Sequence, residues 1–118
     1  MSVEKLLEQS RELERAKIIG ETARIPWRDL QRFFAAGKLL WIDSELDLVD
    51  IAYAVQQDDV TQIEALTGSG QIAVVSDDQA RGWYHSDAEL WAVVVKPWVL
   101  VQERPDHLET APQSDKDT

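Results

Sequence analysis

The sequence contains no cysteine among its 118 residues. This absence excludes disulfides, thiolate zinc sites, iron–sulfur clusters and thiol nucleophiles. Basic residues are also scarce, since 12 Lys and Arg stand against 22 Asp and Glu and give a formal net charge of -10. Affinity for nucleic acids comes largely from Lys and Arg that neutralise phosphates. We therefore expect no nucleic-acid partner.

Long apolar runs and catalytic signatures are missing as well. No apolar run is long enough to cross a bilayer, and charged residues fill the N-terminus where a signal peptide has an apolar stretch. We therefore expect a cytoplasmic protein with no membrane partner. The sequence has no G-x-S-x-G nucleophile elbow, no G-x-G-x-x-G fingerprint and no phosphate-binding loop. These absences favour a protein that is not an enzyme.

The remaining composition is that of a globular protein, with 44% hydrophobic and 29% charged residues. Val3 to Lys17 contain neither Gly nor Pro and predict an amphipathic N-terminal helix within residues 1–20. Residues 21–103 have the apolar content of one compact domain. Residues 104–118 carry two Pro and little that could pack, which predicts a disordered acidic tail.

Apolar periodicity and capping signals predict four helices in the compact domain, and β-branched runs predict the strands. Two segments resemble capping boxes, Ser44 to Asp47 and Ser76 to Gln79. Pro97 interrupts the last apolar run, which is therefore either bent into two strands or placed at a sheet edge. The result is a helix-rich α+β domain with a small sheet of about three strands. The predicted helices begin near residues 21, 44, 58 and 76, and the predicted strands span 38–43, 71–75 and 90–102.

Charge is unevenly distributed along the chain. Residues 39–80 hold nine acids and neither Lys nor Arg, whereas residues 21–38 have a net charge of +2. The acids lack the Gly and Glu positions of an EF-hand loop, and most fall at predicted helix starts, where carboxylates cap free N–H groups. We therefore expect helix caps rather than a metal site, and no cofactor. The alternative is a small-molecule- or metal-binding protein, with possible enzymatic activity, that uses carboxylates of residues 43–59 with His85 or Arg28.

Arginines and aromatic residues form the candidate interface. Three arginines recur at four-residue spacing on the helix predicted from residue 21, where they bind either an acidic partner or the domain's own acids. The chain has five Trp, of which Trp27 and Trp91 are expected in the core. Other aromatic residues end a short helix or follow Pro97, positions suited to exposed anchors. The candidate interface residues are Arg24, Arg28, Arg32, Trp83, Tyr84 and Trp98.

Four segments together are similar to a known family: ETARIPWRDLQRFFAAGKLL, ELDLVDIAYAV, VSDDQARGW and VVVKPWVLVQE. In this order they resemble domain-of-unknown-function family 2288, a small bacterial family, over residues 21–103. The resemblance implies a compact bacterial core to which the N-terminal helix and the tail are additions. It implies no activity, substrate, cofactor or catalytic residue.

Two classes of function follow from these observations. The charge segregation, the aromatic residues and the missing catalytic motifs favour a non-enzymatic interaction or regulatory module, which acts on a protein partner or self-associates, for instance as a homodimer. The alternative is the small-molecule- or metal-binding protein defined above.

Overall fold

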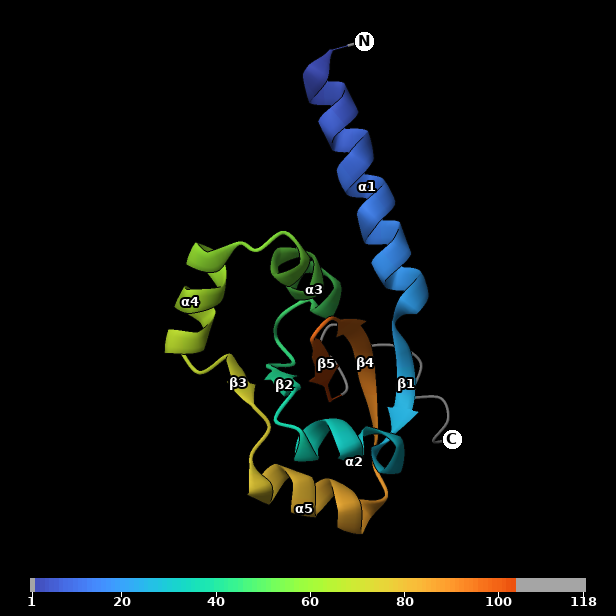
Figure 1. The fold of residues 1–118 in the computed structure, drawn as a ribbon, viewed down its shortest axis with the longest axis vertical. Helices are drawn as coiled ribbons and strands as arrows, with labels where there is room; N and C mark the ends of the chain where they lie inside the picture. The colour runs from blue at the N-terminus through green and yellow to red at the C-terminus, as the bar shows by residue number, and fades with distance from the viewer. Residues whose placement is uncertain (1, 104–118) are drawn as a thin grey trace, which may run out of the picture.

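A computed structural model describes residues 2–103, so the predicted tail at 104–118 lies outside the described residues. The described residues form one α+β domain of five helices and a five-stranded sheet (Figure 1). The strand order is β1-β4-β5-β2-β3, and every pair is antiparallel except β2 with β5. The elements are α1 (Val3–Glu21), β1 (Ala23–Pro26), α2 (Trp27–Ala35), β2 (Leu39–Ile42), α3 (Leu48–Gln56), α4 (Val60–Gly68), β3 (Ile72–Val74), α5 (Asp77–Ser86), β4 (Glu89–Val95) and β5 (Trp98–Gln102).

The sheet has five strands rather than about three for two reasons. The run at 90–102 turns at Lys96-Pro97 and returns as β5, so it supplies two neighbouring strands. Residues 23–26, expected to begin a helix, instead pair with β4 as an edge strand. Pro26 ends that strand and occupies the N-cap position of α2 with an extended backbone and no side-chain cap bond. Helix α2 therefore begins at Trp27, several residues later than the sequence indicates.

The sheet is buried on both faces because the side chains of its strands alternate between two cores. One core lies under α2 and α5 and contains Trp27, Leu30 and Trp83. The opposite core lies under α3 and the end of α1 and contains Ile18 and Ile51. Neighbouring residues of β5 belong to different cores, as alternation requires. The sheet thus separates the surface over α2 and α5 from the surface over α3 and α4.

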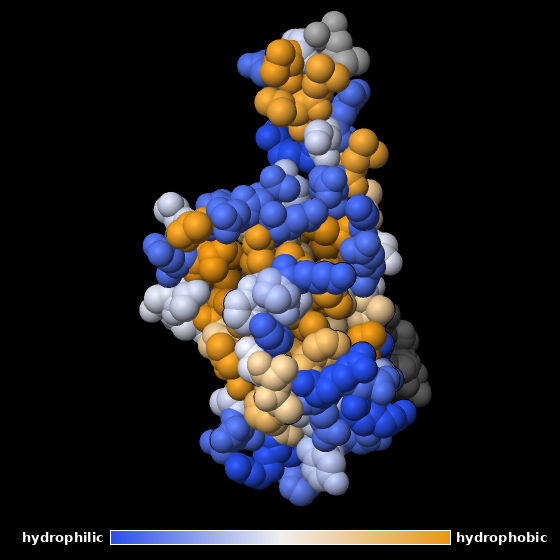
Figure 2. Space-filling view, in the orientation of Figure 1, coloured by the Kyte–Doolittle hydropathy of each residue, from blue (hydrophilic) through white to orange (hydrophobic). Residues whose placement is uncertain are grey.

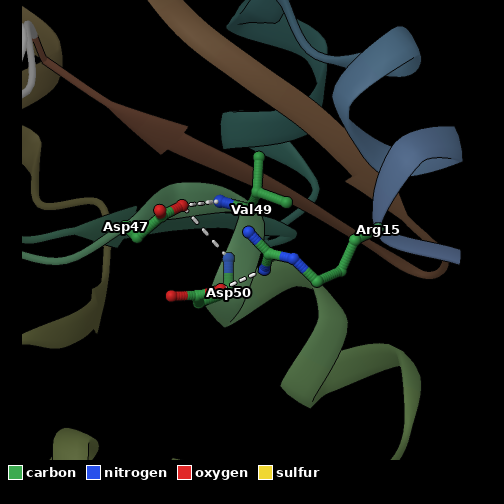
Figure 3. A network of polar contacts seen from close by, with 4 residues as sticks. All are labelled: Arg15, Asp47, Val49 and Asp50. Carbon is green, nitrogen blue, oxygen red and sulfur yellow. Dashed lines mark hydrogen bonds and ion pairs between the residues drawn. The ribbon is translucent and has the colours of Figure 1, made fainter. Parts of the chain in front are cut away.

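Helix α1 is attached to the domain by its C-terminal half alone. Ile18 is buried, Arg15 forms an ion pair with Asp50 of α3 (Figure 3), and Gln56 Nε2 donates to Glu14 Oε1 at 2.9 Å. The first three turns extend beyond the rest of the molecule (Figure 1). Within the described residues, no helix combines the length and the apolarity that a membrane crossing requires.

Helix caps account for several acids of the segment 39–80. Asp47 caps α3 by accepting from the backbone N–H groups of Val49 at 2.9 Å and Asp50 at 3.3 Å (Figure 3). The cap expected at Ser44 is therefore wrong, because the helix begins at Leu48. The capping box that opens α5 is confirmed, and Asp59 caps α4.

Among residues 2–103, one polar side chain, that of Gln102, is fully buried in the sheet. Its Nε2 donates to the carbonyl oxygens of Asp43 at 2.9 Å and Leu46 at 2.8 Å. These two bonds hold the loop between β2 and α3 against β5. They therefore help to set where α3, and α4 after it, leave the sheet.

Candidate functional site

The arginines predicted to form one helical row do not do so. Arg24 lies on β1 opposite Trp91, because residues 23–26 form a strand instead of a helical turn. Arg28 and Arg32 remain one turn apart on α2. Two of the three arginines are paired with acids of the same domain. This agrees with the interpretation that the arginines bind the domain's own acids. The contacts are Arg24 with Glu89 at 3.2 Å, Arg28 with Asp87 at 3.7 Å, and Arg32 over the Phe33 ring at 4.8 Å.

The three aromatic candidates lie in different environments. Trp83 is only 7% exposed, packs on Trp27 with ring centroids 5.6 Å apart, and donates from Nε1 to Glu103 Oε2 at 3.3 Å. It is a core residue, so its expected exposure is wrong. Tyr84 is 63% exposed on α5. Trp98 is half-buried on the opposite face of the sheet, and its strand β5 is central rather than at an edge. The candidate interface residues therefore do not share one surface.

The carboxylate site of the alternative interpretation is also divided by the sheet. His85 contacts Tyr84 edge-on at 5.5 Å on α5, and Arg28 is paired with Asp87. Asp58 and Asp59 lie at the start of α4, over the other face. Within residues 2–103, no group of three or more His, Asp or Glu is arranged to hold a metal ion.

The structure instead shows an apolar groove between α4 and the strands β2 and β3, which we call the α4 groove. Its volume is 340 Å³. In Figure 2, apolar surface lies between α4 and the sheet and is bordered by hydrophilic side chains. A cavity of this size falls within the range of sites that bind ligands or partner side chains. The residues that line it are Leu40, Val55, Asp58, Asp59, Val60, Ile63, Glu64, Thr67, Ile72, Ala73, Val74 and Trp98.

The groove exists because α4 packs loosely on the domain. Asp58 adopts a left-handed backbone with φ of 59° and turns the chain out of α3, so that α4 stands beside the sheet. Across Val60–Gly68 no residue of α4 is buried. Val60 remains 52% exposed, and Val74 on the edge strand β3 remains 57% exposed. Contiguous apolar surface of this kind typically marks an interaction site on a folded protein.

Negative charge borders the apolar lining. Asp58, Asp59 and Glu64 lie around the groove, and the described residues that line it include neither Lys nor Arg. Asp59 already caps α4, whereas Glu64 has no capping role and is exposed. Lys38 stands outside the lining, with its ammonium 5.9 Å from the centre of the Trp98 ring. The groove is therefore complementary to apolar groups that carry positive charge beside them.

Sequence reasoning identified part of this site without recognising it. The acids at 58, 59 and 64 and the apolar residues Val60 and Ile63 were visible as a capped amphipathic helix. The contacts of Trp98 and Val74 with α4 could not be predicted from the sequence, because the order of the strands in the sheet brings these distant residues together. Trp98 is the one candidate interface residue that lines the groove.

Comparison with known proteins agrees with the resemblance seen in the sequence. The family model for proteins of unknown function DUF2288 matches residues 13–103, so the chain belongs to this family. The chain is similar to PA1075 from Pseudomonas aeruginosa, whose solution structure was determined by NMR. The two are 43% identical with a TM-score of 0.71, and the match covers 84% of this chain and 92% of that one. No curated protein matches this chain.

Proposed function

We propose that this member of a family of unknown function is a non-enzymatic protein-interaction module of the bacterial cytoplasm. Its binding surface is the α4 groove. The partner is a protein segment that presents two or three large apolar side chains with Lys or Arg beside them. The observation that carries the proposal is the apolar groove bordered by three carboxylates.

The size and charge of the groove support this class of partner. A water molecule takes a share of about 30 Å³ in the liquid, so 340 Å³ corresponds to about eleven such volumes, or two to three leucine side chains. A segment of that size binds through apolar burial, and its cations gain from the carboxylates at the border. The exposed edge of β3 also allows the segment to bind as an added strand.

A synthetic peptide of alternating Leu and Lys tests the proposal on the full chain. We expect it to shift the NMR signals of the α4 amides and of the Trp98 indole, because both lie at the groove. An Ala–Lys peptide of equal charge and a Leu–Glu peptide serve as controls, and both should bind at least about tenfold more weakly. The substitution E64K should weaken binding of the Leu–Lys peptide in the same assay.

A matched variant separates this groove from the α5 surface that the sequence indicates. Y84A removes the exposed aromatic residue of α5 and should leave peptide binding unchanged. If the shifts map to α2 and α5, or if the Ala–Lys peptide binds equally well, the α4 groove is not the binding surface. The first result would favour the candidate interface around Arg28 and Tyr84.

A second function is favoured by the apolar lining and the bordering carboxylates of the same groove. A small apolar cation, such as a benzylammonium or alkylammonium ion, fits the volume and charge of the lining. This small-molecule site includes Asp58 and Asp59 of the alternative predicted from the sequence, but not His85 or Arg28. A ligand that binds the native state raises the melting temperature by mass action, so a thermal-shift panel of such ions tests it.

A further inference from the structure

The first three turns of α1 carry a second apolar surface, which no other element within residues 2–103 covers. We call it the α1 stripe, and its residues are Val3, Leu6, Leu7 and Leu13. Each of these side chains is more than half exposed. Leu6 and Leu7 follow Val3 by three and four residues, and Leu13 follows Leu6 by seven, so the four lie along one side of the helix. In a polar helix, such residues are expected to pack on another element.

The α1 stripe cannot reach the α4 groove of its own chain. Helix α1 runs straight away from the domain, and its attached half lies against α3 and β4 (Figure 1). The part of the chain that the structure describes therefore presents an apolar groove and an exposed apolar helix face in two separate places. A second copy brings the two together.

We propose that the α1 stripe of one copy occupies the α4 groove of a second copy, and that the exchange is reciprocal. This inference rests on the groove being the binding surface and names its occupant. In a two-fold dimer, each chain donates its helix and accepts the helix of its partner. The same contact therefore forms twice, and it covers the α1 stripe and the α4 groove of both copies.

The charges of α1 are compatible with this arrangement. Glu4, Glu8 and Glu12 follow one another at four-residue spacing on a different side of the helix from the α1 stripe. They therefore point away from the carboxylates that border the groove. Arg11 lies four residues after Leu7 and two before Leu13, so a positive charge flanks the α1 stripe at the end nearer the domain.

The buried area explains why the exchange is reciprocal. One contact between the α1 stripe and the groove buries about 500 Å² in total, taking about 60 Å² for each partly exposed aliphatic side chain. That area is within the range of weak crystal contacts. Two contacts related by symmetry bury about 1,000 Å², near the lower limit for a specific interface. We therefore infer a weak dimer that forms at high protein concentration.

Sedimentation of the full chain and of two double variants tests the assembly. The wild type should form a dimer at high concentration. L6E with L13E introduces charge into the α1 stripe, and V60E with V74E introduces it into the groove. Each double variant should raise the dimer dissociation constant by at least about tenfold. All four positions are more than half exposed, so the variants should fold, which circular dichroism verifies.

Disulfide trapping identifies the contact itself, because the chain has no cysteine of its own. A chain with L6C and a chain of different mass with V74C are mixed under mild oxidation. The proposal predicts mixed L6C–V74C dimers as the main product. L6C–L6C dimers as the main product would show that two α1 helices pair with each other and would overturn it.

A wild-type chain that stays monomeric throughout would also overturn the inference. That result leaves the proposed function standing if the Leu–Lys peptide still binds the groove. The reverse outcome is a dimer that is trapped through α1 and the groove but has no affinity for the peptide. It would contradict the proposal of a basic protein partner and support the proposal that a second copy occupies the groove.

Discussion

At the scale of single residues, Trp83 and Tyr84 show how neighbours in one helix take different roles. Helix α5 is amphipathic, so Ala80 and Trp83, three residues apart, face the core together. Tyr84 is rotated away from that side and is exposed. The spacing between Ala80 and Trp83 was the signal that could have placed Trp83 in the core from the sequence.

These neighbours should differ sharply in their contribution to stability. W83A leaves a cavity beside Trp27 and should lower the free energy of unfolding by about 3–5 kcal/mol. Y84A removes an exposed ring and should cost less than about 1 kcal/mol. Urea unfolding of the two variants measures both values. Equal losses would show that the packing of α5 differs from the structure described.

At the scale of elements, α4 differs from the other helices because it buries none of its residues. Its neighbour α3 has the same length and buries four residues, including Ile51. Regions with few buried apolar contacts open locally at low free energy. The movable side of the groove is therefore its helix, and the sheet is the fixed side.

Hydrogen exchange should detect this difference. We expect amides of α4 to exchange faster than those of α3 in the same protein, because α4 has no fully buried residue and α3 has four. An occupant of the groove should slow exchange in α4 and leave α2 unaffected. Exchange in α4 as slow as in α3 would indicate that the groove is held open rigidly, and NMR detection of individual amides distinguishes these results.

Local signals were enough to predict most helices, but not the extent of the sheet. The capping box at Ser76 and the cap at Asp59 depend on residues within one turn, so sequence reasoning located them correctly. Strand β1 has four residues and exists through its pairing with β4, far away in the chain. The same holds for the groove, since the parallel pairing of β2 with β5 brings Trp98 beside Leu40. Tertiary contacts outweigh local preference at both places.

At the scale of the whole molecule, the net charge of -10 acts differently on the two proposed partners. A basic peptide is attracted over distances comparable with the Debye length. Two copies of the chain repel each other over the same distances, while their apolar surfaces attract only on contact. The two kinds of binding should therefore respond to salt with opposite signs.

Raising the salt concentration from about 0.1 M to about 1 M shortens the Debye length from about 10 Å to about 3 Å. The dissociation constant of the Leu–Lys peptide should rise by about tenfold or more, because its attraction to the acidic chain is screened. The dimer should become tighter, because screening removes repulsion between copies. Titration and sedimentation across this range measure the two trends, and a dimer that dissociates in salt would contradict the second.

The loose attachment of α4 has a consequence for protein engineering. The nine residues of α4 contribute no buried side chain, and they lie between the cap at Asp59 and the left-handed turn at Gly70. With those two ends retained, and with Ile63 and Leu66 kept because they pack against one core, the other residues of α4 can be exchanged as a cassette. A library built on α4 would alter what the groove accepts and leave the scaffold that presents it unchanged.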